Sequence, residues 1–504
     1  MVFFARTMTL QMNSNPQTQH ASPSIAIIGT GFGGIGLAIR LKKAGFNNFT
    51  LFEKAGDVGG VWRDNTYPGA ACDVPSHLYS FSFEQDLGWL NRYGKSAEIH
   101  QYLRHCADKY DLRPHIQFNT EIAAADFDDK TGIWTLQTTQ GALHQASIMV
   151  AAVGQLNRPA YPNIKGLHSF AGKTFHSARW DHDYDLTGKR VAVIGTGASA
   201  IQFVPEIVPQ VAQLDLYQRS APYVLPKPDK AYPKVEKALF KHIPLLQSLD
   251  RAWQYGFHEV RLLGFTTSVN EMVLVEYLFQ KHIREVIKDN KLRHRLTPDY
   301  PIGCKRILIS NDWYKTMLSP KVNIISDGIT EVVPEGIRTE DGKVHAVDAI
   351  IYGTGFAATD FLAPMQITGL HGKELKQVWQ HGAEAYLGLT VSGFPNLFML
   401  YGPNTNLGHN SIVYMLESQF NYVLDALEKM QGNGLRYLDV KTDVQDKFNA
   451  DIQQRMKKTM WAQGCTSWYQ TAEGKNTNNW PGFTFDYRER TRSIKLKEYN
   501  QVKT

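Results

Sequence analysis

Two glycine-rich motifs of the same kind constrain the fold of this chain more than any other feature of its sequence. The first motif, residues 29–34, reads Gly-Thr-Gly-Phe-Gly-Gly, and the second, residues 195–200, reads Gly-Thr-Gly-Ala-Ser-Ala. Such a motif, placed between a buried strand and a helix, lets backbone amides at the start of the helix approach a pyrophosphate. The pair therefore predicts an α/β protein with two Rossmann-like dinucleotide-binding domains.

The residues around the first motif complete one nucleotide-binding unit. Residues 24–28 form an apolar run that enters the motif, residues 35–43 continue with helical spacing, and residues 49–52 form a second apolar run that ends at Glu53. This order predicts a strand, a glycine loop, a helix and a strand, with an acid where the ribose lies. Because a carboxylate there accepts hydrogen bonds from ribose hydroxyls and repels a ribose phosphate, we expect the first nucleotide to be FAD or NAD, not NADP.

The second unit differs at the residue that selects the ribose. Residues 190–194 and 213–217 are its predicted strands, and the second of them continues into Gln218-Arg219-Ser220, with no acid. A guanidinium at this position binds a 2′-phosphate through paired hydrogen bonds, and the serine hydroxyl is a further donor. Arg219 could instead be a solvated surface residue, but its position favours cofactor binding. The second nucleotide is therefore predicted to be NADPH.

The length of 504 residues is too great for one hydrophobic core and predicts two or three domains. Apolar residues with helical spacing between the two halves of the second unit, with a break at Pro244, indicate a helical insertion there. Two apolar runs, residues 147–153 and 349–352, each end at a glycine and mark where the chain leaves and re-enters the first domain. We therefore predict the first part of an FAD-binding domain at 22–157, an NADP-binding domain at 158–355 with its insertion at about 228–298, and the completion of the FAD-binding domain at 356–504.

The segment between the two units, residues 170–181, reads Phe-Ala-Gly-Lys-Thr-Phe-His-Ser-Ala-Arg-Trp-Asp. His176 and Trp180 are four residues apart and would share one face if this segment were a helix. The acids and histidine at residues 181–183 could suggest a metal cluster, but the spacing is tight and no other ligand group accompanies them. We therefore expect no metal site.

Three further segments carry residues that could take part in chemistry. In Gly59-Gly60-Val61-Trp62 the glycines let the backbone approach a cofactor ring, and Trp62 is either a core residue or a stacking partner. Asp73, after the turn at residues 67–69, either caps that turn or holds a charge in the active site. Lys305-Arg306 form either a solvated edge or a site in which one cation binds a phosphate and the other stabilises an anion.

Composition and charge exclude several other classes of protein. The net charge of +6 is small and scattered, which argues against nucleic acid, and no apolar run is long enough to span a membrane. The four cysteines include no Cys-x-x-Cys pair, which disfavours a disulfide reductase and a zinc knuckle. We expect free thiols and a cytoplasmic protein. Residues before Ser24 are interpreted as a frayed tail or as the product of a start codon placed too early.

Together these motifs resemble those of the type I Baeyer–Villiger monooxygenases, flavoproteins of the class B monooxygenase group. The signature Phe-x-Gly-x-x-x-His-x-x-x-Trp, followed by Pro or Asp, matches Phe170, Gly172, His176, Trp180 and Asp181. A second signature matches Gly59, Gly60, Trp62, Tyr67, Pro68, Gly69 and Asp73. A glycine-rich hinge matches Gly353-Thr354-Gly355, and the resemblance covers roughly residues 24–490.

The resemblance implies FAD and NADPH as cofactors and a small-molecule ketone and O2 as partners. It implies that Arg306 is the catalytic arginine, that Asp73 is its acidic partner, and that His176 and Trp180 belong to a mobile linker between the domains. Glu53 would bind the FAD ribose, and Arg219, Ser220 and Lys305 would select the 2′-phosphate of NADPH. The full set of cofactor-binding residues that it implies is Gly29, Gly31, Phe32, Gly34, Glu53, Val61, Trp62, Asp73, Val74, Tyr79, Ile122, Gly195, Thr196, Gly197, Ala198, Ser199, Ala200, Arg219, Ser220, Lys305, Arg306 and Trp468.

The resemblance also implies a reaction. NADPH reduces FAD, O2 adds to the reduced flavin, and the resulting peroxyflavin attacks a ketone carbonyl to give an ester or lactone. A fixed guanidinium at Arg306 would keep the peroxide anionic and stabilise the oxyanion. An N- or S-oxygenating flavin monooxygenase is the alternative within the enzymes, and a nucleotide-binding redox sensor is the alternative outside them. Residues 402–410 depart from the ketone-oxidising members, so the ketone stays open, as does the choice between monomer and dimer.

Overall fold

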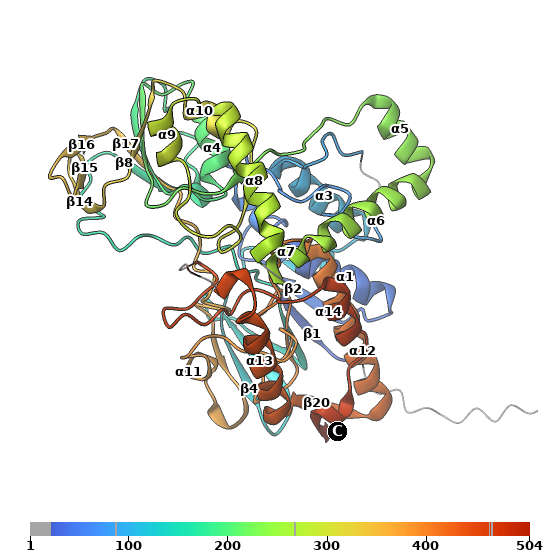
Figure 1. Cartoon of the computed structure of the whole chain (residues 1–504). Helices are drawn as coiled ribbons and strands as arrows, with labels where there is room; N and C mark the ends of the chain where they lie inside the picture. The colour runs from blue at the N-terminus through green and yellow to red at the C-terminus, as the bar shows by residue number, and fades with distance from the viewer. Residues whose placement is uncertain (1–21, 86–87, 267–268, 463, 465–466) are drawn as a thin grey trace, which may run out of the picture.

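Two parallel sheets, each covered by helices, organise the molecule, and a group of helices in the middle of the chain reaches from one to the other (Figure 1). The computed structural model describes residues 22–85, 88–266, 269–462, 464 and 467–504. The interpretation of the segment before Ser24 as a tail falls largely on residues 1–21, outside the described part. The predicted fold class, two Rossmann-like domains with a helical insertion in the second, is confirmed.

The first sheet has the strand order β19-β7-β1-β2-β3, and each neighbouring pair is parallel. β1 is apolar and wholly buried, as expected of a strand with both faces covered. α1 follows β1 and packs against α12 from the C-terminal part of the chain, so the two helices share one core with the sheet. The bounds of these elements are β1 (Ile25–Ile28), β2 (Phe49–Phe52), β3 (Ile116–Gln117), β7 (Ile148–Ala151), β19 (Leu397–Met399), α1 (Phe32–Lys43) and α12 (Ile412–Asn433).

β19 joins the first sheet although it comes late in the chain, which is evidence on how the chain divides into domains. This strand follows the whole second sheet in the chain, yet it pairs with β7 at the edge of the first sheet. The pairing supports the proposed division of the FAD-binding domain into residues 22–157 and 356–504, and we keep those bounds as a proposal.

The second sheet has the order β13-β10-β9-β17-β8 and is also parallel throughout. α4 (Ala200–Ile207) follows β9, as a helix follows β1 in the first unit. Four strands of the two sheets, β2, β9, β10 and β17, have the bounds predicted from the sequence. The strands of the second sheet are β8 (Lys173–His176), β9 (Arg190–Ile194), β10 (Gln213–Tyr217), β13 (Val322–Ile325) and β17 (Ala349–Tyr352).

The predicted helical insertion is confirmed as a group of five helices. Pro244 separates the first two of them and occupies the first turn of α6, where its missing N–H leaves no hydrogen bond unmade. In the longest of these helices, α8, Phe279 and Ile283 face the core of the second domain, as their spacing predicts. The bounds are α5 (Lys234–His242), α6 (Pro244–Val260), α7 (Leu262–Thr266), α8 (Val269–Val286) and α9 (Asn290–Arg295).

Smaller sheets and helices complete the two domains. The helices are α2 (Val61–Asp64), α3 (Ser96–Lys109), α10 (Trp313–Thr316), α11 (Leu375–Val378), α13 (Thr442–Met456) and α14 (Thr484–Arg490). The sheet β18-β4-β5-β6 comprises Gln366–Thr368, Ile122–Asp128, Ile133–Thr138 and Leu143–Ala146. The others are β14 (Ile329–Val333), β15 (Gly336–Thr339) and β16 (Val344–Ala346), β11 (Val224–Leu225) with β12 (Leu308–Ile309), and β20 (Leu435–Val440) with β21 (Tyr499–Lys503).

The prediction that all cysteines are free is contradicted by Cys304. Cys72 and Cys106 are free and buried, whereas Cys304 is disulfide-bonded, and Cys465 lies outside the described residues. Disulfide pairing depends on distances across the fold, which the spacing of cysteines along the chain does not show. Among the helices in the described part of the chain, none is long and apolar enough to cross a lipid bilayer.

Candidate active site

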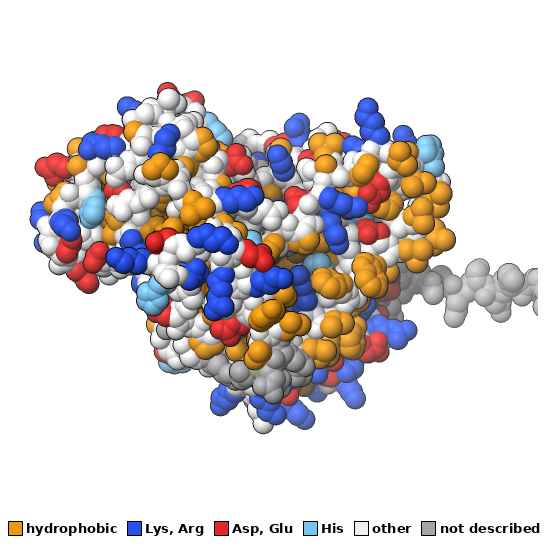
Figure 2. Space-filling view, turned by 45° about the horizontal axis from the view of Figure 1, so that its top comes forward, with side chains coloured by type: hydrophobic (Ala, Val, Ile, Leu, Met, Phe, Trp, Pro, Cys, Tyr) orange, Lys and Arg blue, Asp and Glu red, His pale blue; other side chains and the backbone are white. Residues whose placement is uncertain are grey.

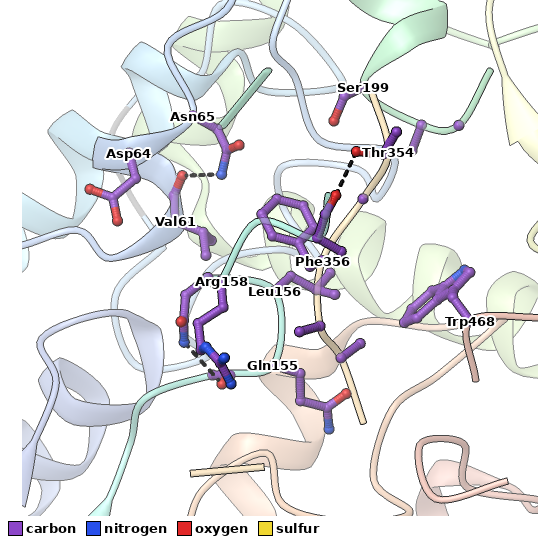
Figure 3. Close-up of a pocket in the computed structure, with 18 of the residues that line it drawn as sticks. Val61, Asp64, Asn65, Gln155, Leu156, Arg158, Ser199, Thr354, Phe356 and Trp468 are labelled. Atoms are coloured by element: carbon purple, nitrogen blue, oxygen red, sulfur yellow. Dashed lines mark hydrogen bonds between the residues drawn. The ribbon is translucent and has the colours of Figure 1, made fainter. Parts of the chain in front are cut away.

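One large cavity is lined by the glycine loops of both units. Its volume is about 1220 Å³, above the roughly 1,000 Å³ that limits most single-ligand pockets. Figure 3 shows its wall drawn from distant segments, with Val61 and Ser199 from the two units, Leu156 and Phe356 from the connections between them, and Trp468 from the C-terminal region. The cavity therefore has room for more than one ligand between the two nucleotide-binding units.

The first glycine loop is shaped to bring backbone close to a ligand. Gly29 has φ +104°, and a Cβ there would lie 2.6 Å from the carbonyl oxygen of Ala152. A Cβ on Gly34 would lie 1.9 Å from the oxygen of Gly29, so only glycine lets α1 pack this tightly on the loop. α1 begins at Phe32 with no acid in its first turn, and Gly31 and Phe32 line the cavity. Backbone amides at the start of α1 are therefore available for a pyrophosphate.

Glu53 lies at the end of β2, buried and held in one orientation. Its Oε2 accepts hydrogen bonds from the N–H and the hydroxyl of Thr30 at 3.1 and 2.6 Å, and its Oε1 pairs with Nη1 of Arg63 at 3.0 Å. The carboxylate lines the cavity at the position predicted for a ribose. Arg63 was not predicted from the sequence, although its place one residue after Gly-Gly-Val-Trp is the signal that could have indicated it.

A second pair of glycines and two aromatic residues face the loop of the first unit. Gly60 has φ +53°, and a Cβ there would lie 3.2 Å from Cα of Gly31. Trp62 donates from Nε1 to the Tyr79 hydroxyl at 3.2 Å, and the two rings meet edge to face. Trp62 is half-buried and lines the cavity rather than filling the core. Val61, Val74 and Ile122 line the same cavity.

Arg306 and Asp73 form an ion pair in the wall of this cavity. Nε and Nη2 of Arg306 donate to Oδ2 of Asp73 at 3.1 and 2.6 Å, and 28% and 30% of the two side chains stay exposed. Burial raises the pKa of Asp73, but the guanidinium outweighs burial and holds that pKa below its usual value. Asp73 in turn raises the pKa of Arg306. The ion pair favours an active-site role for both residues over a turn cap for Asp73 and a solvated edge for Arg306.

Tyr401 is a cavity residue that the sequence did not reveal. Its hydroxyl donates to Oδ1 of Asn406 at 2.6 Å, and its backbone has φ +62°, which is rare outside glycine. Burial raises the pKa of Tyr401, although Arg306 acts in the opposite direction, so the phenol stays protonated. Tyr401 follows β19 in a stretch without a motif, and no signal in the sequence indicated it.

The second glycine loop repeats the geometry of the first and leads to a group of cations. Gly195 has φ +107°, and a Cβ there would lie 2.4 Å from the oxygen of Gly353 in the hinge. Beyond β10, Nζ of Lys305 donates to Oγ of Ser220 at 3.0 Å and lies 4.2 Å from the ring centre of Tyr300. Burial and the nearby Arg219 lower the pKa of Lys305, as expected of two cations that share one part of the cavity.

The linker residues lie outside the cavity wall. His176 ends β8 and is fully buried, its Nδ1 accepts the N–H of Ala178 at 3.1 Å, and burial lowers its pKa to about 4. Trp180 follows a short 3-10 helix (Ser177–Arg179) and packs against Phe203 of α4 with ring centres 5.3 Å apart. The two residues therefore do not share a helical face, because β8 extends through His176 by pairing with β17. Asp181 pairs with Lys173, whereas Phe170 and Gly172 pack beside each other.

Gln202 of α4 connects the two domains beside the cavity. Its Oε1 accepts the Tyr67 hydroxyl at 2.9 Å and the N–H of Ala71 at 3.3 Å, and its Nε2 donates to the oxygen of Ala71 at 3.0 Å. A Cβ on Gly69 would lie 2.7 Å from the backbone oxygen of Gln202, so the turn at residues 67–69 lies directly against α4. This contact places Asp73 of the first domain within reach of Arg306 of the second.

The structure brings most of the predicted cofactor residues to this one cavity. Residues that line it are Gly29, Gly31, Phe32, Glu53, Val61, Trp62, Asp73, Val74, Tyr79, Ile122, Gly195, Thr196, Gly197, Ala198, Ser199, Arg219, Ser220, Lys305, Arg306 and Trp468. Gly34 and Ala200 lie behind the loops rather than in the wall, because each is the position at which a helix packs on its loop. In the described part of the chain there is no group of His, Cys, Asp and Glu that could hold a metal ion.

Comparison with known proteins places this geometry among flavoproteins. A family model described as flavin-binding monooxygenase-like matches residues 22–368. The chain is 48% identical over 499 residues to a protein named Baeyer-Villiger monooxygenase from Pseudomonas aeruginosa, with 98% of this chain and 95% of the relative covered. It is 45% identical over 486 residues to a protein of the same name from Streptomyces coelicolor, with 96% and 93% covered.

Solved structures resemble the chain over nearly its whole length. An oxidized steroid monooxygenase bound to NADP superposes with a TM-score of 0.85 at 31% identity and covers 96% of this chain and 100% of its own. A structure of OTEMO in complex with FAD and NADP superposes with a TM-score of 0.86 at 27% identity, with 95% and 99% covered.

Proposed function

We infer that this chain, which belongs to the flavin-binding monooxygenase-like family, is an FAD-containing, NADPH- and O2-dependent Baeyer–Villiger monooxygenase. It inserts one oxygen atom beside a ketone carbonyl and gives an ester or lactone. The observation that carries this conclusion is the Arg306–Asp73 ion pair in the wall of the cavity between two dinucleotide-binding units. In this arrangement a permanent cation lines the cavity in which the two cofactors would be bound.

The residues of the first unit fit FAD. Gly31 and Gly60 face each other across a gap that side chains would fill, and both line the cavity. The amides at the start of α1 suit the pyrophosphate, and the Glu53 carboxylate suits ribose hydroxyls because it is buried and acceptor-only. We propose that Val61, Trp62, Val74, Tyr79 and Ile122 lie against the flavin.

The residues of the second unit fit NADPH in preference to NADH. Arg219, Lys305 and the Ser220 hydroxyl lie together at the end of β10, where a 2′-phosphate would meet two cations and a hydroxyl donor. Burial and the nearby Arg219 lower the pKa of Lys305, which supports the proposal that positive charge gathers here for an anion to neutralise. We propose that these three residues select the phosphorylated cofactor.

Arg306 supplies the fixed positive charge that the attack on a ketone carbonyl requires from the protein. Bound FAD, once reduced by NADPH, supplies the activation of O2. A guanidinium beside the reacting oxygen keeps that oxygen anionic and stabilises the negative charge that develops on the ketone oxygen. Asp73 holds the guanidinium through two of its N–H groups and thereby fixes the direction in which the others point. Asp73 is therefore proposed as the positioning partner and Arg306 as the catalytic residue.

The linker residues are proposed to act on the arrangement of the domains. His176 meets the ring of Phe356 in a connection between the two units, and Trp180 packs on α4 of the second unit, which supports this proposal. Trp468 lines the cavity from the C-terminal region, and we propose that it contacts cofactor or substrate. The choice between monomer and dimer and a cytoplasmic location stay predictions.

A paired substrate assay tests the proposed reaction. The purified holoenzyme is supplied with NADPH and a panel of linear, cyclic and aryl ketones, each matched with a thioether of similar size, and the products are identified. Esters or lactones formed in step with ketone-stimulated NADPH oxidation are expected. Sulfoxides without any ester would favour the N- or S-oxygenating alternative, and a protein without bound flavin and without substrate-stimulated NADPH oxidation would favour a redox sensor.

A further inference from the structure

The helix α6 of the insertion has its polar side turned inward and its apolar side turned outward. Its buried residues are all polar, namely Gln247, Gln254, His258 and Glu259. Leu249, Trp253 and Phe257 on the other side are 57%, 72% and 54% exposed. A surface helix of a globular domain normally shows the reverse pattern, because its apolar stripe packs on the core. The outer side of α6 therefore needs an apolar environment that the described part of the chain does not provide.

Polar contacts fix α6 in this orientation. Nε2 of Gln247 donates to the oxygen of Gln85, and Nη1 of Arg251 donates to the oxygen of Ser80, both at 2.9 Å. Near the other end of α6, Glu259 accepts hydrogen bonds from Asn410 at 2.6 Å and from the Thr484 hydroxyl at 2.9 Å. Turning the apolar side inward would break these bonds and bury unpaired polar groups. The exposed stripe is therefore a constant feature of the folded protein.

The preceding helix extends the apolar surface. α5 buries none of its residues, and its exposed Val235 and Leu239 are followed by exposed Ile243 at the junction with α6. We call these two helices the insertion hairpin, with an apolar face made of Val235, Leu239, Ile243, Leu245, Leu246, Leu249, Trp253, Phe257 and Val260. In Figure 1 α5 stands away from both sheets, and Figure 2 shows hydrophobic side chains gathered on the right-hand side of the molecule with basic side chains beside them. The face is too large for scattered surface residues and indicates an interaction site.

The charges of the insertion hairpin identify the partner. Lys234, Lys237 and Lys241 on α5 form no ion pair within the described residues, and the acid of that helix, Glu236, pairs with Lys230. A helical surface with Leu, Trp and Phe on its apolar side and unpaired lysines on its polar side has the composition of helices that lie flat in the interface of an anionic bilayer. A second copy of the chain fits less well, because a two-fold contact sets the same lysines of both copies near each other without acids to pair with.

We propose that the insertion hairpin docks the enzyme on the surface of an anionic lipid bilayer, with the apolar side of α6 in the headgroup region and the lysines of α5 against lipid phosphates. Because no described helix can cross a bilayer, the contact is peripheral. Tryptophan suits this position, since its ring is apolar and its N–H hydrogen-bonds at the wet boundary. The proposal is independent of the reaction inferred for the cavity.

Vesicle co-sedimentation of the full-length holoenzyme tests the proposal. Vesicles of phosphatidylcholine alone are compared with vesicles that also contain phosphatidylglycerol, at low and high salt. Binding to the mixed vesicles is expected, with weaker binding to the neutral vesicles and at high salt. The double variant Leu249→Gln/Trp253→Ser is expected to lower the affinity for mixed vesicles by about tenfold or more. The triple variant Lys234→Gln/Lys237→Gln/Lys241→Gln is expected to lose the preference for anionic lipid.

Two controls keep the test specific. Leu143→Gln removes a leucine of β6 that is 65% exposed and lies outside the insertion hairpin, and it should bind vesicles as the parent does. Each variant is checked for unchanged flavin content and unfolding temperature. The proposal is overturned by absence of binding to mixed vesicles, or by equal binding of the double variant and its parent. It is also overturned if the enzyme without lipid is a dimer that Leu249→Gln/Trp253→Ser dissociates, because a second copy then covers the face.

Discussion

Arg306 directs two of its N–H groups, on Nε and Nη2, at a single oxygen of Asp73, at 3.1 and 2.6 Å. The two residues come from different domains, and each lies in a segment anchored nearby, Asp73 beside the turn that Gln202 holds and Arg306 beside Lys305, which bonds to Ser220. The ion pair therefore depends on the relative position of the domains. A change that moves one domain against the other alters the direction of the guanidinium.

Replacing Asp73 by Asn tests the positioning role. Asn has nearly the same shape but no charge, so it loses the ionic hold on Arg306 while the cavity keeps its volume. We expect ester formation to fall about 100-fold, the effect of misplacing one donor to a developing oxyanion, while reduction of the flavin by NADPH changes far less. The control is Asp360→Asn, which removes an acid of the same cavity wall that pairs with Arg158 at 3.5 Å. Equal ester yields in Asp73→Asn and its parent would refute the role.

Removing Arg219 or Lys305 should weaken the binding of NADPH and leave the binding of NADH unaffected. Each side chain is expected to contribute one charge-assisted hydrogen bond to the 2′-phosphate, so either alanine variant should raise the KM for NADPH by about 10- to 100-fold. Steady-state kinetics with NADPH and with NADH gives the KM for each coenzyme in the parent and in the variants. Lys189→Ala, which removes a half-buried lysine outside the cavity, is the matched control. A rise of the same size in the KM for NADH would mean that the two residues do not contact the 2′-phosphate.

Gly33 and Gly34, in the first turn of α1, should respond differently to alanine. At Gly34 the new Cβ would lie 1.9 Å from the backbone oxygen of Gly29, whereas at Gly33 its nearest neighbour is Cβ of Leu400 at 3.4 Å. Gly34→Ala is therefore expected to lose about 3 kcal/mol of stability and most of its bound FAD, and Gly33→Ala to lose much less of both. Flavin absorbance per protein and thermal unfolding measure the two effects. Similar losses in both variants would show that the packing of α1 on its loop does not determine flavin binding.

His176 should make stability depend on pH. Burial lowers its pKa from 6.5 to about 4, so between these values the unfolded chain binds the additional proton and the stability of the folded protein falls as pH decreases. Below about pH 4 this contribution is fully lost, and its total size is about 3 kcal/mol. His176→Asn keeps an acceptor for the N–H of Ala178 but does not titrate, so it should flatten the stability curve between pH 4 and 6.5. Urea unfolding at several pH values in this range measures the free energy of unfolding. If that free energy depends on pH in the variant as it does in the parent, the buried, neutral state of His176 is contradicted.

The sequence predicts the fold well where local pattern and fold agree. Strands such as β9 and β10 are continuous apolar runs next to a glycine loop, and the break at Pro244 follows from a residue that cannot continue a helix. The bounds of the linker elements could not be predicted in this way, because β8 exists only through its pairing with β17.

The same distinction holds for the residues of the candidate active site. Residues within motifs, such as Glu53 and Arg219, reach the cavity because the motif itself determines where they lie. Gln202 was missed because its contacts with Tyr67 and Ala71 join segments far apart in the sequence. Tyr401 stands in a stretch without a motif, and the motif before Arg63 was not extended to that residue. Cys304 shows the same limit, because its bonded state follows from proximity in space.

The most direct test of the account is the product balance of Arg306→Ala. In a stopped-flow experiment with anaerobic enzyme, NADPH should still bleach the flavin at a rate close to that of the parent, because both glycine loops and the 2′-phosphate site are intact. When oxygen and ketone are then admitted, NADPH should be oxidised without formation of ester or lactone. An ester yield equal to that of the parent would contradict the central claim that the cation held by Asp73 carries the attack on the carbonyl.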